Sequence, residues 1–280
     1  MNVTTHKHAI GAVFDQAAAE FDQSGVPFFT PLGRRLVEIA APRPGEQVLD
    51  VGCGRGSCLF PARDRVGPQG AVTGIDISPE MVRLTAAEAR RRGLTNVTIE
   101  LMDGERPQFP RDSFDVVLAG FSIMHMPLAP DSLVPYLTVL KPGGRFCFTD
   151  LVDNEGLPPF VPPAAFAVLE PHFPAGPNPK ERGTAGWSST AQGTAEALTA
   201  RGFEDVHALE EVFSMVLADG DHWADWSMST GLRAAWERIP PTEYAEVRAS
   251  VAQAVQATAG GPGTVTLPVQ VRYVTARRPD

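Results

Sequence analysis

Residues Val48 to Gly56 read VLDVGCGRG, a short apolar run around Asp50 followed by glycines at every second position. A glycine-rich turn between a strand and a helix commonly holds a phosphate through its backbone amides. Here the spacing is G-x-G-x-G rather than the dinucleotide pattern G-x-G-x-x-G, and the turn has no lysine for a nucleoside triphosphate. The Asp50 carboxylate would repel a pyrophosphate and attract an ammonium group. The turn therefore favours a ligand with a cationic end.

Around this turn, short β-branched runs alternate with helical stretches. This alternation is typical of an α/β fold, in which a parallel sheet is wrapped by helices. The expected strands are residues 47–51, 71–75, 97–101, 114–119 and 145–149, and the expected helices are residues 57–66, 79–92 and 131–140. We interpret residues 46–150 as the α/β core that binds the cofactor.

Three further regions flank this core. Residues 1–45 are interpreted as an N-terminal helical cap segment, and the proline-rich residues 151–187, with their interspersed phenylalanines, as an ordered substrate lid. Residues 188–280 complete the sheet, with a helix over 188–201, strands over 203–217 and 265–276, and a helical insertion at about 219–258. Trp223 and Trp226 of this insertion either pack in the core or line an aromatic pocket.

The composition narrows the class of protein. The 280-residue chain has a net charge of -9, so its overall field repels a nucleic-acid backbone. No apolar run reaches roughly 18 residues and the N-terminus lacks a signal-peptide layout, so we expect no membrane span and a cytoplasmic protein. The odd number of cysteines fits a reducing compartment and offers no zinc site. The expected partner is a small molecule, and homo-oligomer formation remains open.

Two more acids fall where a nucleoside would need them. Asp76 ends the second strand, as does the carboxylate that holds ribose hydroxyls in nucleotide-binding α/β folds. Asp103 follows the third strand at the same edge of the sheet, where a carboxylate can accept a hydrogen bond from an exocyclic amine. Each acid alone suits a helix cap or a turn, but their joint spacing with Asp50 favours a ligand site.

Taken in order, these motifs resemble the class I S-adenosylmethionine-dependent methyltransferases. VLDVGCGRG resembles the first motif of that family, GIDIS (74–78) its ribose-binding acid and MDGE (102–105) its adenine-contacting loop. FDVVLAGFSIMHM (114–126) resembles the fourth strand and following loop, and LKPGGRFCFTD (140–150) the entry to the fifth strand. The resemblance implies a Rossmann-like seven-stranded sheet with helices on both faces and antiparallel last strands. It also implies S-adenosylmethionine as cofactor.

The resemblance also implies roles for the matching positions. Asp50, Gly52 and Gly54 would face the methionine part of the cofactor, and Asp76 the ribose hydroxyls. The residues implied beside the adenine are Ile77, Met81, Asp103 and Gly104, and those implied near the sulfonium are the loop from Phe121 to His125.

An N-terminal stretch, FDQAAAEFDQ at residues 14–23, resembles a paired aromatic-aspartate segment that closes over the cofactor in small-molecule members of the family. That segment usually carries tyrosines. Phe14 and Phe21 keep the aromatic ring but lose the hydroxyl, so Phe21 is expected to bind the cofactor through its ring alone.

Methyl transfer from a sulfonium is an in-line displacement that mainly requires alignment and exclusion of water. If the acceptor starts protonated, His125 is the leading candidate base, and otherwise it shapes the cofactor site. Glu170 and its neighbour His172, in the proline-rich segment, are weaker candidates. The acids Asp150 and Asp153 match a metal site poorly, so no metal is expected.

The aromatic, proline-shaped lid favours a medium-sized, largely apolar acceptor of the kind found in natural-product or quinone biosynthesis. Oxygen, nitrogen and carbon all remain possible acceptor atoms. One alternative is an enzyme of the same fold that binds S-adenosylmethionine but catalyses a cyclisation or rearrangement without methyl transfer. A nicotinamide-dependent oxidoreductase is disfavoured by Asp50 and by the glycine spacing.

Overall fold

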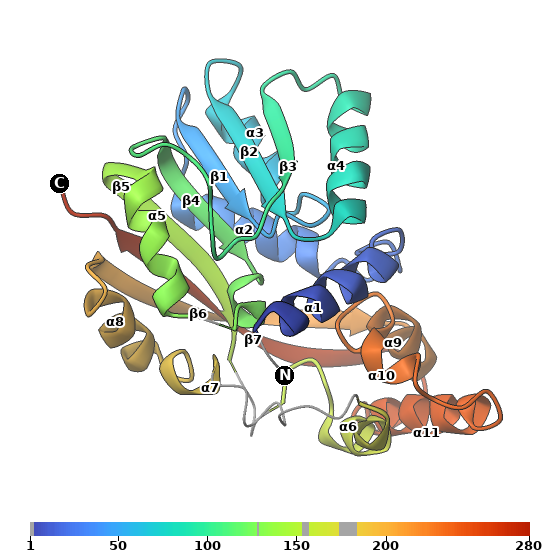
Figure 1. Ribbon diagram of the computed structural model, residues 1–280. Coiled ribbons are helices and arrows are strands. Elements are labelled where there is room, and N and C mark those ends of the chain that lie inside the picture. The colour runs from blue at the N-terminus through green and yellow to red at the C-terminus, as the bar shows by residue number, and fades with distance from the viewer. Residues whose placement is uncertain (1–2, 128, 153–156, 174–183) are drawn as a thin grey trace.

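The computed structural model describes residues 3–127, 129–152, 157–173 and 184–280. Within these residues, one mixed sheet has the strand order β3-β2-β1-β4-β5-β7-β6 (Figure 1). The strands are β1 (Gln47–Val51), β2 (Ala71–Asp76), β3 (Val97–Leu101), β4 (Phe114–Gly120), β5 (Leu140–Leu151), β6 (Glu204–Leu217) and β7 (Val265–Arg277). β1 to β5 pair in parallel, whereas β7 is antiparallel to both β5 and β6. The expected Rossmann-like α/β sheet with antiparallel last strands is confirmed.

Helices connect and cover these strands. The α-helices are α1 (Val3–Ala17), α2 (Phe29–Ala40), α3 (Leu59–Val66), α4 (Pro79–Arg91), α5 (Val134–Val139), α6 (Pro163–Leu169), α7 (Thr184–Trp187), α8 (Ala191–Thr199), α9 (Gly220–Ser227), α10 (Arg233–Trp236) and α11 (Tyr244–Ala257). Short 3-10 turns are η1 (Ile123–His125), η2 (Asp131–Leu133) and η3 (Glu170–His172). Helices therefore occur along the whole described chain, and they lie on both faces of the sheet (Figure 1).

Two hydrophobic cores lie on opposite faces of the sheet. Successive side chains of a strand point to opposite faces, so Val116 of β4 packs with α2 and α3, whereas Val117 packs with α5 and α8. The same division separates Val48 from Leu49 in β1. Because β1 and β4 are central and buried on both faces, they carry apolar residues at consecutive positions, Val48 and Leu49 in β1 and residues 116–119 in β4, rather than at alternating ones.

Several element bounds differ from those expected. α3 begins at Leu59 rather than at residue 57, because three glycines with positive φ keep the preceding turn out of the helical region. β5 begins at Leu140 rather than at residue 145, since Leu140 pairs with Phe114 before a register shift. Where a helix was expected over residues 188–201, the structure has the shorter α8. The helix begins after Thr190 because the side chain of Thr190 caps it by accepting a hydrogen bond from the amide of Gly193.

The expected helical insertion contains α9, α10 and α11, with α11 packed against both α9 and α6. Trp223, Trp226 and Trp236 are all buried, so the core-packing interpretation of these tryptophans is confirmed. The indole N–H of Trp223 donates to the carbonyl of Phe160 at 2.9 Å. This bond ties the insertion to the proline-rich segment, and the remaining part of that segment, residues 153–156 and 174–183, lies outside the described residues.

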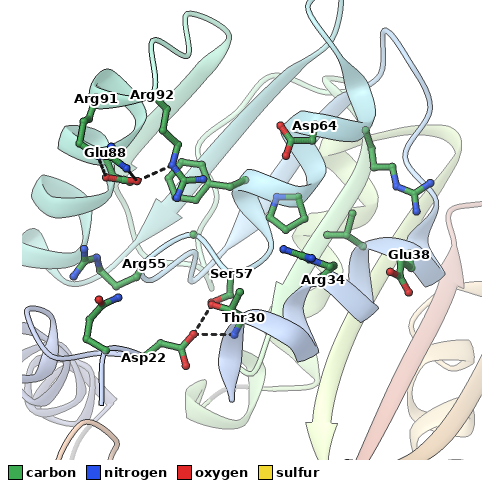
Figure 2. A pocket seen from close by; sticks show the side chains of 16 residues that line it. Asp22, Thr30, Arg34, Glu38, Arg55, Ser57, Asp64, Glu88, Arg91 and Arg92 are labelled. Atoms are coloured by element: carbon green, nitrogen blue, oxygen red, sulfur yellow. Dashed lines mark hydrogen bonds and ion pairs between the residues drawn. The ribbon is translucent and has the colours of Figure 1, made fainter. Parts of the chain in front are cut away.

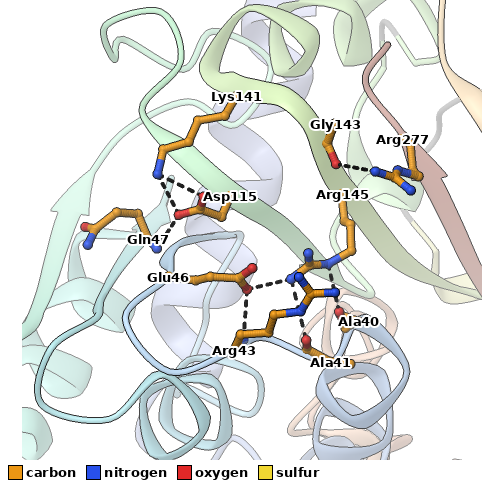
Figure 3. Close-up of polar contacts among 10 residues, drawn as sticks. All are labelled: Ala40, Ala41, Arg43, Glu46, Gln47, Asp115, Lys141, Gly143, Arg145 and Arg277. Carbon is orange, nitrogen blue, oxygen red and sulfur yellow. Dashed lines mark hydrogen bonds and ion pairs between the residues drawn. The ribbon is translucent and has the colours of Figure 1, made fainter. Parts of the chain in front are cut away.

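Ionic contacts join the amino ends of the central strands (Figure 3). Asp115 accepts the amide of Gln47 at 2.8 Å and pairs with Lys141 at 2.8 Å. Arg145 pairs with Glu46 at 2.5 Å and donates to the carbonyl of Ala40 at 3.1 Å. These contacts fix the amino ends of the strands. The three acids expected to bind a ligand lie at the opposite, carboxyl ends.

Candidate active site

The glycine turn between β1 and α3 requires its glycines for two different reasons. Gly52, Gly54 and Gly56 all have positive φ, of 67°, 49° and 86°. A Cβ on Gly52 would lie 2.4 Å from Cβ of Ser122, and one on Gly56 would lie 2.4 Å from the ring of Phe60. A Cβ on Gly54 would have no neighbour within 4 Å among the described residues. Gly54 therefore leaves its backbone open to a ligand, whereas the other two permit close packing.

Asp76 links this turn to the end of β2. Its Oδ2 accepts the amide of Gly54 at 2.8 Å, and its Oδ1 accepts the amide of Ser78 at 2.9 Å. Burial raises the pKa of Asp76, and the two backbone amides offset part of that rise. Each carboxylate oxygen has a second lone pair, so Asp76 can still accept from a ribose diol.

Asp50 is a buried carboxylate near the glycine turn. Neither of its oxygens has a hydrogen-bond partner of normal geometry among the described residues, and the residue is 1% exposed. Burial raises the pKa of Asp50 to about 7, the negative charge of Asp76 adds to the rise, and the Leu59 amide opposes it. An unpartnered buried carboxylate is costly, and a cation compensates that cost. The residue therefore fits the ammonium group of a methionine moiety.

The loop after β3 holds the third acid. Oδ1 of Asp103 accepts the amide of Glu105 at 3.0 Å, and its Oδ2 pairs with Lys7 of α1 at 2.6 Å. The carbonyl of Gly104 accepts from the hydroxyl of Tyr136 at 2.8 Å. A Cβ on Gly104 would lie 2.8 Å from the side chain of Val51, so the loop approaches β1 closely.

Helix α1 lies beyond the carboxyl ends of the strands that carry these acids (Figure 1). Asp15 of α1 accepts from the hydroxyl of Ser78 at 2.5 Å and from the amide of Glu80 at 2.9 Å, at the start of α4. In the middle of α1, a Cβ on Gly11 would lie 3.7 Å from the carbonyl oxygen of Ile77. Just after α1, the carbonyl of Ala18 accepts from Arg55 of the glycine turn at 2.6 Å. The N-terminal helix therefore contacts the loops after β1, β2 and β3 in turn.

Phe21 and Asp22, the second Phe-Asp pair of the N-terminal segment, make different contacts. Phe21 stacks on Phe29 with ring centroids 4.4 Å apart and shares a small core with Met81 of α4. Asp22 accepts the amides of Phe29 and Thr30 at 3.1 Å and 2.9 Å, which caps the start of α2. The structure thus places Phe21 and Met81 together, beside the residues that follow β2.

The loop after β4 is held against the glycine turn. Phe121 has a φ of 56°, an uncommon conformation for a residue with a side chain, and its amide donates to Oγ1 of Thr149 at 2.8 Å. The hydroxyl of Ser122 donates to the carbonyl of Val51 at 2.7 Å. The half-buried His125 contacts the ring of Phe14 edge to face, with centroids 5.2 Å apart. Strained backbone of this kind is concentrated at functional sites.

Glu170 is not brought to this group. It lies in η3 after α6 and is exposed, and no hydrogen bond or ion pair joins its side chain to the residues that the structure describes. Its catalytic role stays a prediction. Of the acids considered for a metal, Asp153 lies outside the described residues, whereas Asp150 accepts the amide of Leu151 at 2.9 Å.

A cavity of about 750 Å³ lies on the outer side of the glycine turn, between α2, α3 and α4 (Figure 2). Its walls carry charges of both signs, and many of these are paired. Glu88 contacts Arg91 and Arg92, whereas Asp22 contacts Thr30. Arg55 and Gly56 of the glycine turn line this cavity, whereas Asp76, Asp103 and Phe121 do not, so it adjoins the turn without including the acids that follow β2 and β3.

Three site contacts were not apparent from the sequence. Thr85 of α4 donates to the carbonyl of Gly54 at 2.6 Å, Arg55 holds the end of α1, and Lys7 pairs with Asp103. Each joins segments far apart in the chain, and no local pattern marks them. The only feature of the sequence that marks Lys7 is that it is a single lysine in an N-terminal stretch with few basic residues.

Across the described ranges, no helix is both long and apolar enough to cross a membrane. Nor do those residues include three or more His, Cys, Asp and Glu side chains grouped as metal ligands. The three cysteines are buried free thiols.

The fold and the three acids at the carboxyl ends of β1 to β3 define a nucleoside-binding α/β enzyme with a place for a cationic group. A family model described as a methyltransferase domain matches residues 42–173. The chain is 41% identical over 273 residues to the nocamycin O-methyltransferase of Saccharothrix syringae, covering 95% of this chain and 97% of the relative. This chain belongs to the class I S-adenosylmethionine-dependent methyltransferases that act on small molecules, and S-adenosylmethionine is its cofactor.

Two further similarities bear on the reaction. The chain is 48% identical over 163 residues to the aklanonic acid methyltransferase DauC of Streptomyces sp. (strain C5), covering 58% of this chain and 74% of the relative. The crystal structure of the 4+2 cyclase SpnF aligns with a TM-score of 0.56 and 25% identity, over 89% of this chain and 80% of that one. The methyltransferase similarity is both higher in identity and, for the nocamycin enzyme, wider in coverage.

Proposed function

We propose that this methyltransferase transfers a methyl group to an oxygen atom of a medium-sized, largely apolar small molecule in natural-product biosynthesis. The observation that carries the proposal is the 41% identity, along nearly the whole of both chains, with a relative named as a natural-product O-methyltransferase. The name of the second relative adds a carboxylic acid to the chemical types worth testing.

A buried aromatic cluster packs against the loop after β4. Phe28 contacts Phe121, Phe160 and Trp226, with ring centroids 6.1, 5.6 and 5.3 Å apart. These rings come from the N-terminal segment, the β4 loop, the proline-rich segment and the helical insertion. The rings are buried, so they give the loop after β4 an apolar backing, and an acceptor held next to that loop would be shielded from water, which favours a displacement reaction.

The residues present fit S-adenosylmethionine. Asp50 would face its ammonium group, Asp76 its ribose hydroxyls and Asp103 its adenine amine. Gly54 leaves its backbone open to the methionine part, and Gly52 lets the turn that faces it pack against Ser122. The cofactor supplies a methyl group on a positively charged sulfur. Phe121, Ile77, Met81, Gly104 and Phe21 would shape the rest of its binding site.

His125 is the proposed general base for an acceptor that starts as a neutral hydroxyl. Phe14 packs edge to face on its ring and limits the orientations of the imidazole. The imidazole would take the hydroxyl proton as the oxygen attacks the methyl carbon. A carboxylate acceptor is already ionised near pH 7 and needs no base. For such an acceptor, His125 would act only in positioning.

Methyl-labelled S-adenosylmethionine tests the proposal directly. The purified protein would be incubated with a panel of aromatic and polyketide-type phenols, enols and carboxylic acids, and the products analysed by mass spectrometry. We expect label in an O-methyl group of at least one product. A substrate that is converted without gaining label would instead establish the cyclisation alternative, which the similarity to SpnF keeps in the test.

We also infer a cytoplasmic location, which the three free thiols support because a reducing compartment preserves them. The net charge of -9 supports a partner that is not nucleic acid. Homo-oligomer formation is a further proposal that light scattering coupled to size-exclusion chromatography would test.

A further inference from the structure

Lys7 of α1 contacts two acids of the loop after β3 at once. Its ammonium lies 2.6 Å from Oδ2 of Asp103 and 2.5 Å from Oε2 of Glu105. The side chains of Lys7 and Glu105 are 13% and 1% exposed. An exposed ion pair contributes little to stability, whereas removing one partner of a buried pair leaves a costly uncompensated charge. This contact therefore differs in kind from the surface ion pairs elsewhere in the chain.

The contact leaves room for a third donor. Two carboxylates share one ammonium, so the group retains one net negative charge. Each oxygen of Asp103 has two lone pairs, and one lone pair on each is used, by Lys7 and by the Glu105 amide. An exocyclic amine can therefore donate to Asp103 while Lys7 remains bound to both acids.

The contacts of α1 are distributed along its length. The second half of the helix is tied at Asp15 to the start of α4, and the carbonyl of Ala18 just beyond it is tied to Arg55. Towards the N-terminus, Lys7 pairs with both Asp103 and Glu105, and Gly11 lies against Ile77 between the two ends. Lys7 therefore supplies two ionic contacts between the first half of α1 and the loop after β3.

We propose that Lys7 is a positioning residue whose paired contacts with Asp103 and Glu105 hold α1 closed over the adenine side of the cofactor and slow its release. The proposal rests on the assignment of Asp103 to the adenine, made under the proposed function. Because binding and closure both use Asp103, each stabilises the other: bound cofactor holds α1 closed, and closed α1 retains the cofactor.

The test compares Lys7→Met and Lys7→Arg with the wild type, with Lys141→Met as a matched control. Lys141 also pairs with an aspartate, Asp115, but at the amino edge of the sheet. Dissociation of S-adenosylhomocysteine is measured by stopped flow, and exchange of the α1 amides by hydrogen-exchange mass spectrometry in the saturated complex. We expect Lys7→Met to raise the dissociation rate about tenfold. We also expect faster exchange in residues 3–17, partial rescue by Lys7→Arg and no change in Lys141→Met.

Salt provides a second measurement on the wild-type protein, which does not depend on how well a variant folds. Asp103 is the most exposed member of the contact, with 31% of its side chain exposed, so salt should weaken its pairing with Lys7 modestly. The dissociation rate of the wild type should therefore rise with salt more steeply than that of Lys7→Met. The proposal would be overturned if Lys7→Met showed the same dissociation rate and the same α1 amide exchange as the wild type. If S-adenosylhomocysteine also bound Asp103→Ala with wild-type affinity, the assignment of the adenine would fail as well, so the two failures are distinguishable.

Discussion

Oδ2 of Asp76 accepts a 2.8 Å hydrogen bond from the amide of Gly54, so the end of β2 directly sets the conformation of the glycine turn that follows β1. A ligand that binds both strands therefore meets a joined surface rather than two independent loops. This relationship makes Asp76 the residue whose substitution should affect the cofactor site most.

Replacing Asp76 with alanine should remove the acceptor for the ribose hydroxyls and the bond to Gly54 together. Charged hydrogen bonds are worth about 1.5–3 kcal/mol each, so the Kd for S-adenosylhomocysteine should rise at least about a hundredfold. Isothermal titration calorimetry measures this change. Asp64→Ala, at an exposed position of α3, is the control, and an unchanged Kd for Asp76→Ala would refute the ribose assignment.

Cofactor affinity should depend on pH through Asp50. Because the pKa of Asp50 is about 7 without a ligand, and an ammonium group favours the ionised carboxylate, affinity for S-adenosylhomocysteine should increase as the pH rises from 6 to 8. Asp50→Asn should bind weakly and lose this increase. Affinity measured across that range checks both, and a flat wild-type profile would argue against a direct ionic role.

The same residue should affect the stability of the cofactor-free protein. A carboxyl whose pKa rises from 3.8 to about 7 on folding binds its proton more tightly in the native state. Its stabilising contribution is therefore complete below about pH 4 and is lost as the pH rises through 7, by an amount on the order of 4 kcal/mol. Thermal unfolding between pH 5 and 8 should show this loss in the wild type. Asp50→Asn should lack it, and parallel curves for the two proteins would contradict the prediction.

Alanine substitutions at Gly52 and Gly54 separate two roles of the glycine turn, close packing and ligand access. Gly52→Ala places a Cβ 2.4 Å from Ser122 at a positive φ, so both folding stability and cofactor binding should fall, stability by about 2 kcal/mol or more. Gly54→Ala meets nothing within 4 Å among the described residues, so only the backbone strain of about 1 kcal/mol applies to stability. Its cofactor affinity should nevertheless fall. Urea unfolding and calorimetry separate the two effects.

His125→Asn should distinguish a base from a positioning residue. With a hydroxyl acceptor, kcat should fall about 10²–10⁴-fold, with little change in cofactor affinity. With a carboxylic acid acceptor, the loss should be much smaller, because no proton is removed. Steady-state kinetics with one acceptor of each type gives the comparison, and equal losses for both would assign His125 a role in shape alone.

The sequence was sufficient for the features that depend on neighbouring residues. The spacing of Gly52, Gly54 and Gly56 and the strand positions of Asp50 and Asp76 are local, and they predicted both the sheet and the class of cofactor. Contacts between distant segments were not predictable in this way. Lys7 and Asp103 are 96 residues apart, and only the folded positions of α1 and β3 bring them together.

Errors in the expected bounds have similar causes. Leu140 has an ordinary helix-forming side chain and follows a helical stretch, yet it belongs to β5 because Phe114 provides a strand partner. The start of α3 was placed too early because sequence periodicity does not show how many residues a glycine turn needs. At both positions, strand pairing or backbone geometry sets the bounds of the element, and local helix propensity does not.

The insertion of α9 to α11 begins after Leu217 and ends before Val265, and these two residues are paired neighbours on β6 and β7. A segment whose two ends meet in adjacent strands can be exchanged without stretching or shifting the flanking chain. The junction is therefore a natural splice point for building chimeras. Helices grafted there from a related enzyme would keep the pairing of β6 and β7, provided that they preserve the contacts of His222 with Ser24 and of Arg233 with Glu20.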